Sequence, residues 1–118
     1  MIVTMPFSGR PGPTTRIVVG DSVDELSDEF NSTTDGKPAV GAVLTAELGD
    51  IRFTMGGNIT TPTYPPTQGA SGLGHILYEG QSLVLSSGPT VRTFQFIAHT
   101  NGVAATLQVT PLFEGGVS

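Results

Sequence analysis

Residues 91–110 read VRTFQFIAHTNGVAATLQVT and contain two apolar alternations on either side of an Asn-Gly pair. The apolar positions are Phe94, Phe96 and Ala98 before the pair and Val103, Ala105, Leu107 and Val109 after it. Alternation with a period of two is typical of a β-strand with one buried face. Asn-Gly is the strongest short signal for a two-residue type I′ turn. The segment therefore predicts a β-hairpin closed at Asn101-Gly102.

The same alternation continues upstream, between turns that contain Gly or Pro. Further strands are predicted at residues 16–19, 44–48, 51–55, 76–78 and 82–85. The Gly49-Asp50 turn joins two of them into a predicted strand pair. Short strands every 8 to about 12 residues are typical of an antiparallel β-sandwich or a jelly-roll-like barrel. We therefore predict an all-β fold of this kind, with a core formed by Ile51, Phe53, Leu83, Leu85, Phe94, Phe96, Leu107 and Val109.

One short helix is predicted near residue 22, from the only helical signal in the chain. Asp21 or Ser22 can cap it, Ser22 and Glu25 have the spacing of a capping box, and Leu26 and Phe30 are four residues apart. The acidic residues of this segment lack the alternating oxygens and central glycine of a calcium loop. Acidic residues in a first helical turn are favoured by the helix dipole, so no metal site is expected here.

The composition bounds the class of protein. The chain has 118 residues and a mass of 12.2 kDa, the size of one ordinary domain. It has no cysteine, which excludes disulfides and thiolate metal sites. The formal net charge is −5 with only five Lys and Arg residues, so nucleic acid is not an expected partner. The sequence shows no signal-peptide pattern. It also has no apolar run of about 18 residues, the length that a membrane-spanning helix needs, so no membrane association is expected.

The chain ends differ in composition from the predicted strands. Residues 1–15 contain Pro6, Pro11 and Pro13, which lack the backbone donor that a helix or a central strand needs. We therefore expect an extended N-terminal arm at 1–15, a single sandwich domain at 16–114 and a flexible Gly-rich tail at 115–118.

No motif of the chain predicts catalysis. His75 and His99 have no histidine or acidic residue at metal-ligand spacing. Gly69-Ala70-Ser71-Gly72 lacks the last glycine of a nucleophile elbow, because position 73 is Leu, and no predicted strand precedes it. The same glycines are followed by neither a Lys nor a helix, as a phosphate loop requires. We therefore expect no enzyme activity, no catalytic residues, no metal and no cofactor.

Contacts with other proteins are predicted from the arm and from the Gly- and Pro-rich loop at 56–75. Prolines reduce the entropy that a loop loses when it is ordered against a partner. Arg10 is better placed for an interface than Arg52, which lies on a predicted strand and can pair with Asp50 or Glu47 inside the fold. The predicted interface residues are Phe7, Arg10, Pro11, Pro13, Tyr64, Pro65 and Pro66.

Several short motifs between Asp50 and Thr110 carry a resemblance to a known family. They are DIRFT at 50–54, PT at 62–63, GHIL at 74–77, EGQSL at 79–83, VRTF at 91–94 and ATLQVT at 105–110. Through these motifs the chain resembles the small β-rich structural proteins encoded among the head genes of tailed bacteriophages. The resemblance implies a virion component without catalytic activity, namely a capsid decoration or cement protein.

What the resemblance implies is a homotrimer on the outer capsid surface, at threefold positions, where it binds the major capsid protein and stabilises the shell. Such a protein would be made in the cytoplasm of the bacterial host. Two alternatives remain open, a tail or adaptor protein of the same virion and a small carbohydrate-binding module. Low charge suits the latter, but the chain has no Trp and only Tyr64 and Tyr78 as tyrosines for stacking on a sugar.

Overall fold

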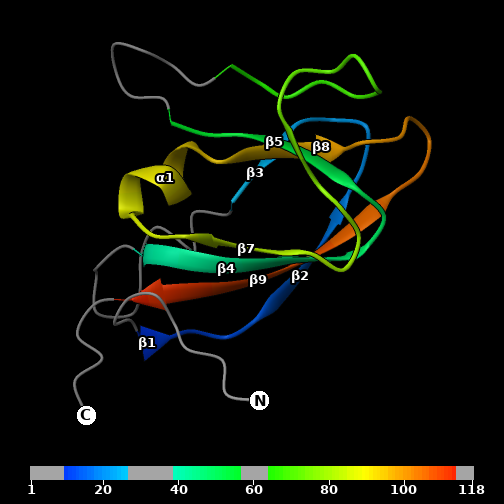
Figure 1. Ribbon diagram of the computed structural model, residues 1–118. Helices are drawn as coiled ribbons and strands as arrows, with labels where there is room; N and C mark the ends of the chain where they lie inside the picture. Colours follow the sequence, from blue (N-terminus) through cyan, green and yellow to red (C-terminus); the bar gives the residue numbers. More distant parts are fainter. Residues whose placement is uncertain (1–9, 27–38, 57–63, 114–118) are drawn as a thin grey trace.

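Two antiparallel β-sheets pack face to face in the computed structural model, which describes residues 10–26, 39–56 and 64–113 (Figure 1). Sheet A contains β1 (Arg10–Pro11), β2 (Thr15–Val19), β9 (Ala105–Phe113), β4 (Ala39–Leu48) and β7 (Ser82–Leu85). In sheet A, β1 and β2 both pair with β9, which pairs with β4, which pairs with β7. Sheet B has the order β3 (Asp24–Glu25), β8 (Gln95–Ala98), β5 (Ile51–Thr54) and β6 (His75–Leu77).

The chain crosses from one sheet to the other at most of its connections. It does so between β2 and β3, between β4 and β5, between β6 and β7, and between β8 and β9. The resulting order, β2-β9-β4-β7 opposite β3-β8-β5-β6, is that of a double-sheet jelly roll. The predicted all-β antiparallel sandwich is therefore confirmed, and the strand order corresponds to its jelly-roll form.

Both predicted strand pairs are wrong, although their turns are present. Gly102 has a φ of +80° and Gly49 a φ of +73°, backbone conformations that glycine adopts readily. However, β8 and β9 lie in different sheets, and so do β4 and β5. Consecutive strands that face each other across a core bury alternate residues just as paired strands do. Alternation alone therefore does not distinguish a hairpin from a crossing between sheets.

The core between the sheets is built on three phenylalanine rings. The ring centroids of Phe53 and Phe94 are 5.2 Å apart, and those of Phe94 and Phe96 are 5.8 Å apart. The other predicted core residues also lie inside, with Leu83 partly buried; those fully buried are Ile51, Leu85, Leu107 and Val109. Because both sheets contribute to this cluster, their relative position is fixed and so is the outer face of each sheet.

The helix lies elsewhere than predicted. Asp24–Glu25 is strand β3, paired with β8, and residues 27–38 lie outside the described residues. The one helix among the described residues is α1 (Gly88–Thr93), where the sequence predicts a turn at 87–89 and the beginning of a strand at Val91. Ser87 caps it, a proline occupies its first turn and Val91 is buried in the core. No helix of the described part is long and apolar enough to cross a membrane.

Part of the expected arm belongs to sheet A. Arg10 and Pro11 pair with the end of β9, and Gly12 N–H donates to the carbonyl oxygen of Pro111 at 2.8 Å. A Cβ atom on Gly12 would lie 2.6 Å from the ring of Phe113, so any other residue here would require this ring to shift. The sandwich therefore begins by residue 10 and not at residue 16. Residues 1–9 and 114–118 lie outside the described residues.

The N-cap of α1 provides a test of this account of the helix. The Oγ of Ser87 accepts a hydrogen bond from the backbone N–H of Thr90 at 3.2 Å. We expect Ser87→Ala to lower the free energy of unfolding by about 1 kcal/mol, the usual effect of losing an N-cap. Ser86→Ala, at the exposed preceding residue, is the matched control and should change it by less than about 0.5 kcal/mol. Equal effects in urea unfolding would contradict the assignment of Ser87 as the cap.

Candidate interaction surface

The segment 64–74 forms an ordered layer on the outer side of sheet B, away from sheet A (Figure 1). Thr67 fixes its turn, because its N–H donates to the carbonyl of Leu73 at 3.1 Å and its Oγ1 accepts from the N–H of Leu73 at 2.6 Å. A Cβ on Gly72 would lie 2.1 Å from the carbonyl oxygen of Thr67. The tight turn therefore requires glycine at position 72. We call residues 64–74 the platform loop.

Arg52 holds the platform loop from below. It lies at the middle of β5, where Ile51 and Phe53 point into the core, and its side chain is 7% exposed. Its guanidinium donates to the carbonyl oxygens of Gly74 at 2.5 Å, Gly69 at 2.9 Å and Ala70 at 3.3 Å. A planar guanidinium presents several donors in a fixed fork, so one side chain can bind three carbonyls.

The predicted carboxylate partners of Arg52 are wrong. Asp50 accepts instead from the backbone N–H of Glu79, and Glu47 pairs with Arg16. The actual partners of Arg52 are backbone carbonyls 17 to 22 residues further along the chain. A pattern of side-chain types does not identify such partners, because every residue has a carbonyl.

Further bonds tie the start and the middle of the platform loop to the rest of the molecule. Thr54 Oγ1 donates to the carbonyl of Tyr64 at 2.6 Å, and the N–H of Gly69 donates to the carbonyl of His99 at 2.9 Å. Gln68 Nε2 donates to Asp21 Oδ1 at 2.8 Å, and the same oxygen accepts from the N–H of Gly102 at 3.0 Å. Both bonds stabilise the charged carboxylate and lower the pKa of Asp21 below its ordinary value; the bond from Gln68 has the larger effect and the bond from Gly102 the smaller.

An apolar groove of about 500 Å³ opens beside the start of the platform loop. Among the described residues, those that line it carry no carboxylate and no Lys or Arg; they are Thr54, Met55, Tyr64, Leu73, Gly74 and His75. The side chains of Tyr64, Leu73 and Met55 are 73%, 50% and 42% exposed. Large apolar side chains around one hollow make this groove a candidate protein-binding surface.

The predicted interface residues are distributed over different places. Tyr64 and Pro65 are exposed beside the groove, and Pro11 and Pro13 are exposed near the edge of sheet A. Pro66 is fully buried, so its side chain packs inside the fold and is not available to a partner; this part of the prediction is wrong. Arg10 lies on β1, and Phe7 lies outside the described residues.

Of the described lining residues of the groove, only Tyr64 was predicted as an interface residue. The alternation of β5 places Met55 on the same side as Phe53, toward the core, but the strand ends at Thr54 and Met55 is exposed. Leu73 is an isolated apolar residue in a Gly-rich segment, and this is a signal that could have identified it. His75 lies at the rim of the groove and His99 lies under the platform loop. Among the described residues, no group of three or more His, Asp or Glu is placed to hold a metal ion.

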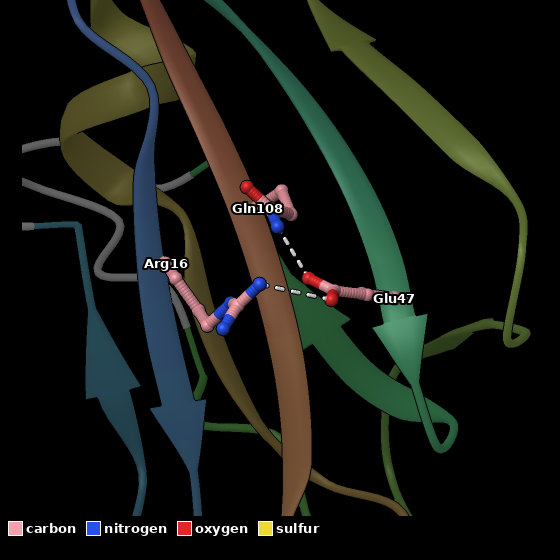
Figure 2. Close-up of polar contacts among 3 residues, drawn as sticks. All are labelled: Arg16, Glu47 and Gln108. Carbon is pink, nitrogen blue, oxygen red and sulfur yellow. Dashed lines mark hydrogen bonds and ion pairs between the residues drawn. The ribbon is translucent and has the colours of Figure 1, made fainter.

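The outer face of sheet A has a different chemistry. Figure 2 shows Arg16 and Gln108 converging on Glu47, with 3.1 Å between Arg16 Nη2 and Glu47 Oε1 and a hydrogen bond from Gln108 Nε2 to Glu47 Oε2. These charges are exposed, so the pair adds little stability. Hydroxyl pairs flank it, with Thr14 to Thr110 at 2.6 Å and Thr45 to Ser82 at 2.8 Å. The part of this face around Glu47 is therefore polar and locally neutral.

Removing the guanidinium of Arg52 should release the platform loop. We expect Arg52→Met to lower the free energy of unfolding by about 2–4 kcal/mol, because three buried carbonyls lose a charged donor. Amide hydrogen exchange in residues 67–74 should accelerate more than in the core strands. Arg92→Met, at an exposed position of α1, is the control and should change stability by less than about 0.5 kcal/mol. Similar stability of the two variants would contradict this role of Arg52.

The hydrogen bonds that Asp21 accepts from Gln68 and Gly102 should make part of the stability depend on pH. Its pKa is lower in the folded state than in the unfolded state, so its contribution is present above the unfolded pKa and is lost as the pH falls through the folded pKa. In Asp21→Asn the side chain is neutral but still has an oxygen acceptor. We expect thermal unfolding between about pH 2 and 5 to depend less on pH in this variant than in the original chain. Parallel melting curves would rule out a contribution from Asp21.

No family model, no curated protein and no solved structure matches this chain.

Proposed function

We propose that this chain is a capsid decoration protein of a tailed bacteriophage, which binds the outer surface of the shell as a trimer and stabilises it. The observation that carries the proposal is the apolar groove, whose rim is held in place before any partner arrives. A surface ordered in advance loses little conformational entropy on binding, which favours adhesion. The resemblance of residues 50–110 to phage head proteins supports the same function.

The groove suits contact between copies of the chain. Each copy carries a net charge of −5, so two copies repel one another over most relative orientations. The lining of the groove contains no carboxylate, and contact there brings apolar side chains together without placing like charges opposite each other. We therefore assign the groove, with Tyr64 and Leu73 at its rim, to the trimer contact.

A trimer would bind a shell through several contacts at once. Each contact already made holds the others at high effective concentration, so weak single contacts add up to firm attachment. Attachment that bridges neighbouring major capsid proteins opposes their separation and thereby stabilises the shell. In this proposal the protein is made in the bacterial cytoplasm and ends on the outer surface of the virion.

A carbohydrate-binding module is the second candidate, and one observation favours it. Tyr64 is highly exposed beside a groove, as a ring that stacks on a sugar would be. A tail or adaptor role is distinguished from the capsid role by the particle to which the protein binds.

The oligomeric state tests the assignment of the groove. Light scattering over a range of concentrations should give the mass of a trimer for the original chain. In Tyr64→Ala and in Leu73→Lys, the protein concentration at which the trimer dissociates should rise by at least about tenfold, since each substitution removes apolar contact from the rim. Tyr78→Ala is the control, because Tyr78 is 53% exposed and does not line the groove. A monomer at all concentrations, or a trimer unaffected by both groove variants, would contradict the assignment.

Binding to particles tests the function itself. The protein should co-sediment with expanded shells of the phage that encodes it and should raise the temperature at which those shells lose integrity. Binding to tails alone would instead support the adaptor function. Binding to a panel of glycans with no affinity for shells would support the carbohydrate-binding module.

A further inference from the structure

Four of the crossings between the two sheets, namely the β2–β3, β4–β5, β6–β7 and β8–β9 connections, lie at the end of the sandwich opposite α1 (Figure 1). Hydrogen bonds join these connections to one another. Glu79 Oε1 accepts from the N–H of Gly49 at 2.8 Å, and Asp50 Oδ1 accepts from the N–H of Glu79 at 2.9 Å. The N–H of Gly102 donates to Asp21, which brings the β2–β3 and β8–β9 connections together. This end of the molecule is therefore a single, internally bonded surface.

Three large apolar side chains are exposed at this end. Val18 and Leu48 are 69% and 58% exposed and are both paired with Thr106, so they flank it on the outer face of sheet A. Val103 is 55% exposed and lines a hollow of about 250 Å³ with Asp50 and Glu79. We call Val18, Leu48 and Val103, with the carboxylates of Asp21, Asp50 and Glu79, the corner patch.

The charge of the corner patch is negative. Its three carboxylates each bind a backbone N–H through one oxygen, so their positions are fixed. The connections at 20–23, 49–50, 78–81 and 99–104 contain no Lys or Arg. The nearest basic residue of the neighbouring face, Arg16, is already paired with Glu47. Apolar side chains bordered by fixed negative charges fit a surface that is apolar at its centre and basic at its rim.

A second copy of this chain does not fit that description. The whole chain has five basic residues, of which Arg52 is buried and Arg16 is paired. Two corner patches placed together would set carboxylates opposite carboxylates, which costs free energy. The groove, in contrast, has no such charges and serves contact between copies. The occupant of the corner patch is therefore a different protein.

We propose that the corner patch docks on a basic, partly apolar area of the major capsid protein, with Leu48 and Val103 as its apolar contacts. This inference rests on the proposed function, because it takes the shell as the partner. In this arrangement the two kinds of contact lie on different surfaces. Copies of the chain bind one another at the groove, and the shell binds the corner patch.

The test compares shell binding and oligomeric mass in the same preparations. Leu48→Lys and Val103→Lys place a positive charge at exposed positions, so both variants should fold with an unchanged melting temperature. We expect each to bind expanded shells about tenfold or more weakly, without a change in mass by light scattering. Leu48→Asp should lose less affinity than Leu48→Lys, because its charge has the sign that suits a basic partner. Val84→Lys, on β7 and outside the patch, is the control and should bind within about twofold of the original chain.

Salt provides a second measurement on the original chain. Raising the ionic strength from about 0.05 to 0.5 M should weaken its shell binding, because salt screens attraction between exposed charges. Full binding by both lysine variants would overturn the inference and leave the proposed function intact. Loss of the trimer in these variants would also overturn it, since the corner patch would then be a contact between copies. Failure of the original chain to bind shells would refute the proposed function and the inference with it.

Discussion

The burial of one guanidinium, that of Arg52, determines the shape of the candidate surface. A segment laid over the outside of a sheet must find donors for its carbonyls, and the three of Gly69, Ala70 and Gly74 find theirs in this fork. Both terminal nitrogens of the guanidinium are thereby bound inside the molecule. With the loop fixed at this point and at Thr54, the side chains of Tyr64 and Leu73 are held around one groove.

Most strands of this fold could be predicted from the sequence, but β1 and β3 could not, and neither could the pairing of the strands. Alternation in residues 51–54 and 94–98 correctly indicates inward-facing Phe53, Phe94 and Phe96. Alternation does not indicate whether the next strand pairs in the same sheet or faces it from the other sheet, because either arrangement buries the same residues. The β4–β9 pairing that decides the jelly roll joins residues more than 50 positions apart. Local turn signals such as Asn101-Gly102 carry no information at that range.

The candidate site was predictable only in part, for the same reason. Tyr64 was found because a proline-flanked aromatic residue in a long loop is a local feature. The burial of neighbouring Pro66 depends on how the platform loop packs on sheet B, which only the folded chain determines. The local signal for the helix was misleading. The capping pattern of Ser22 and Glu25 predicted the helix start, but Asp24–Glu25 pairs with β8, and the helix starts after Ser87, where a turn was predicted.

Charge then separates two surfaces on one small domain. With a net charge of −5, attraction between copies requires a face without carboxylates, and the groove has such a lining. The crossing turns, in contrast, gather Asp21, Asp50 and Glu79, since carboxylates accept hydrogen bonds from the free backbone N–H groups of turns. The turn chemistry that closes the jelly roll thus also gives one end a fixed negative charge. In the proposed function, a domain with an uncharged groove and an acidic end binds its own copies and a basic partner at the same time, because neither contact occupies the surface that the other needs.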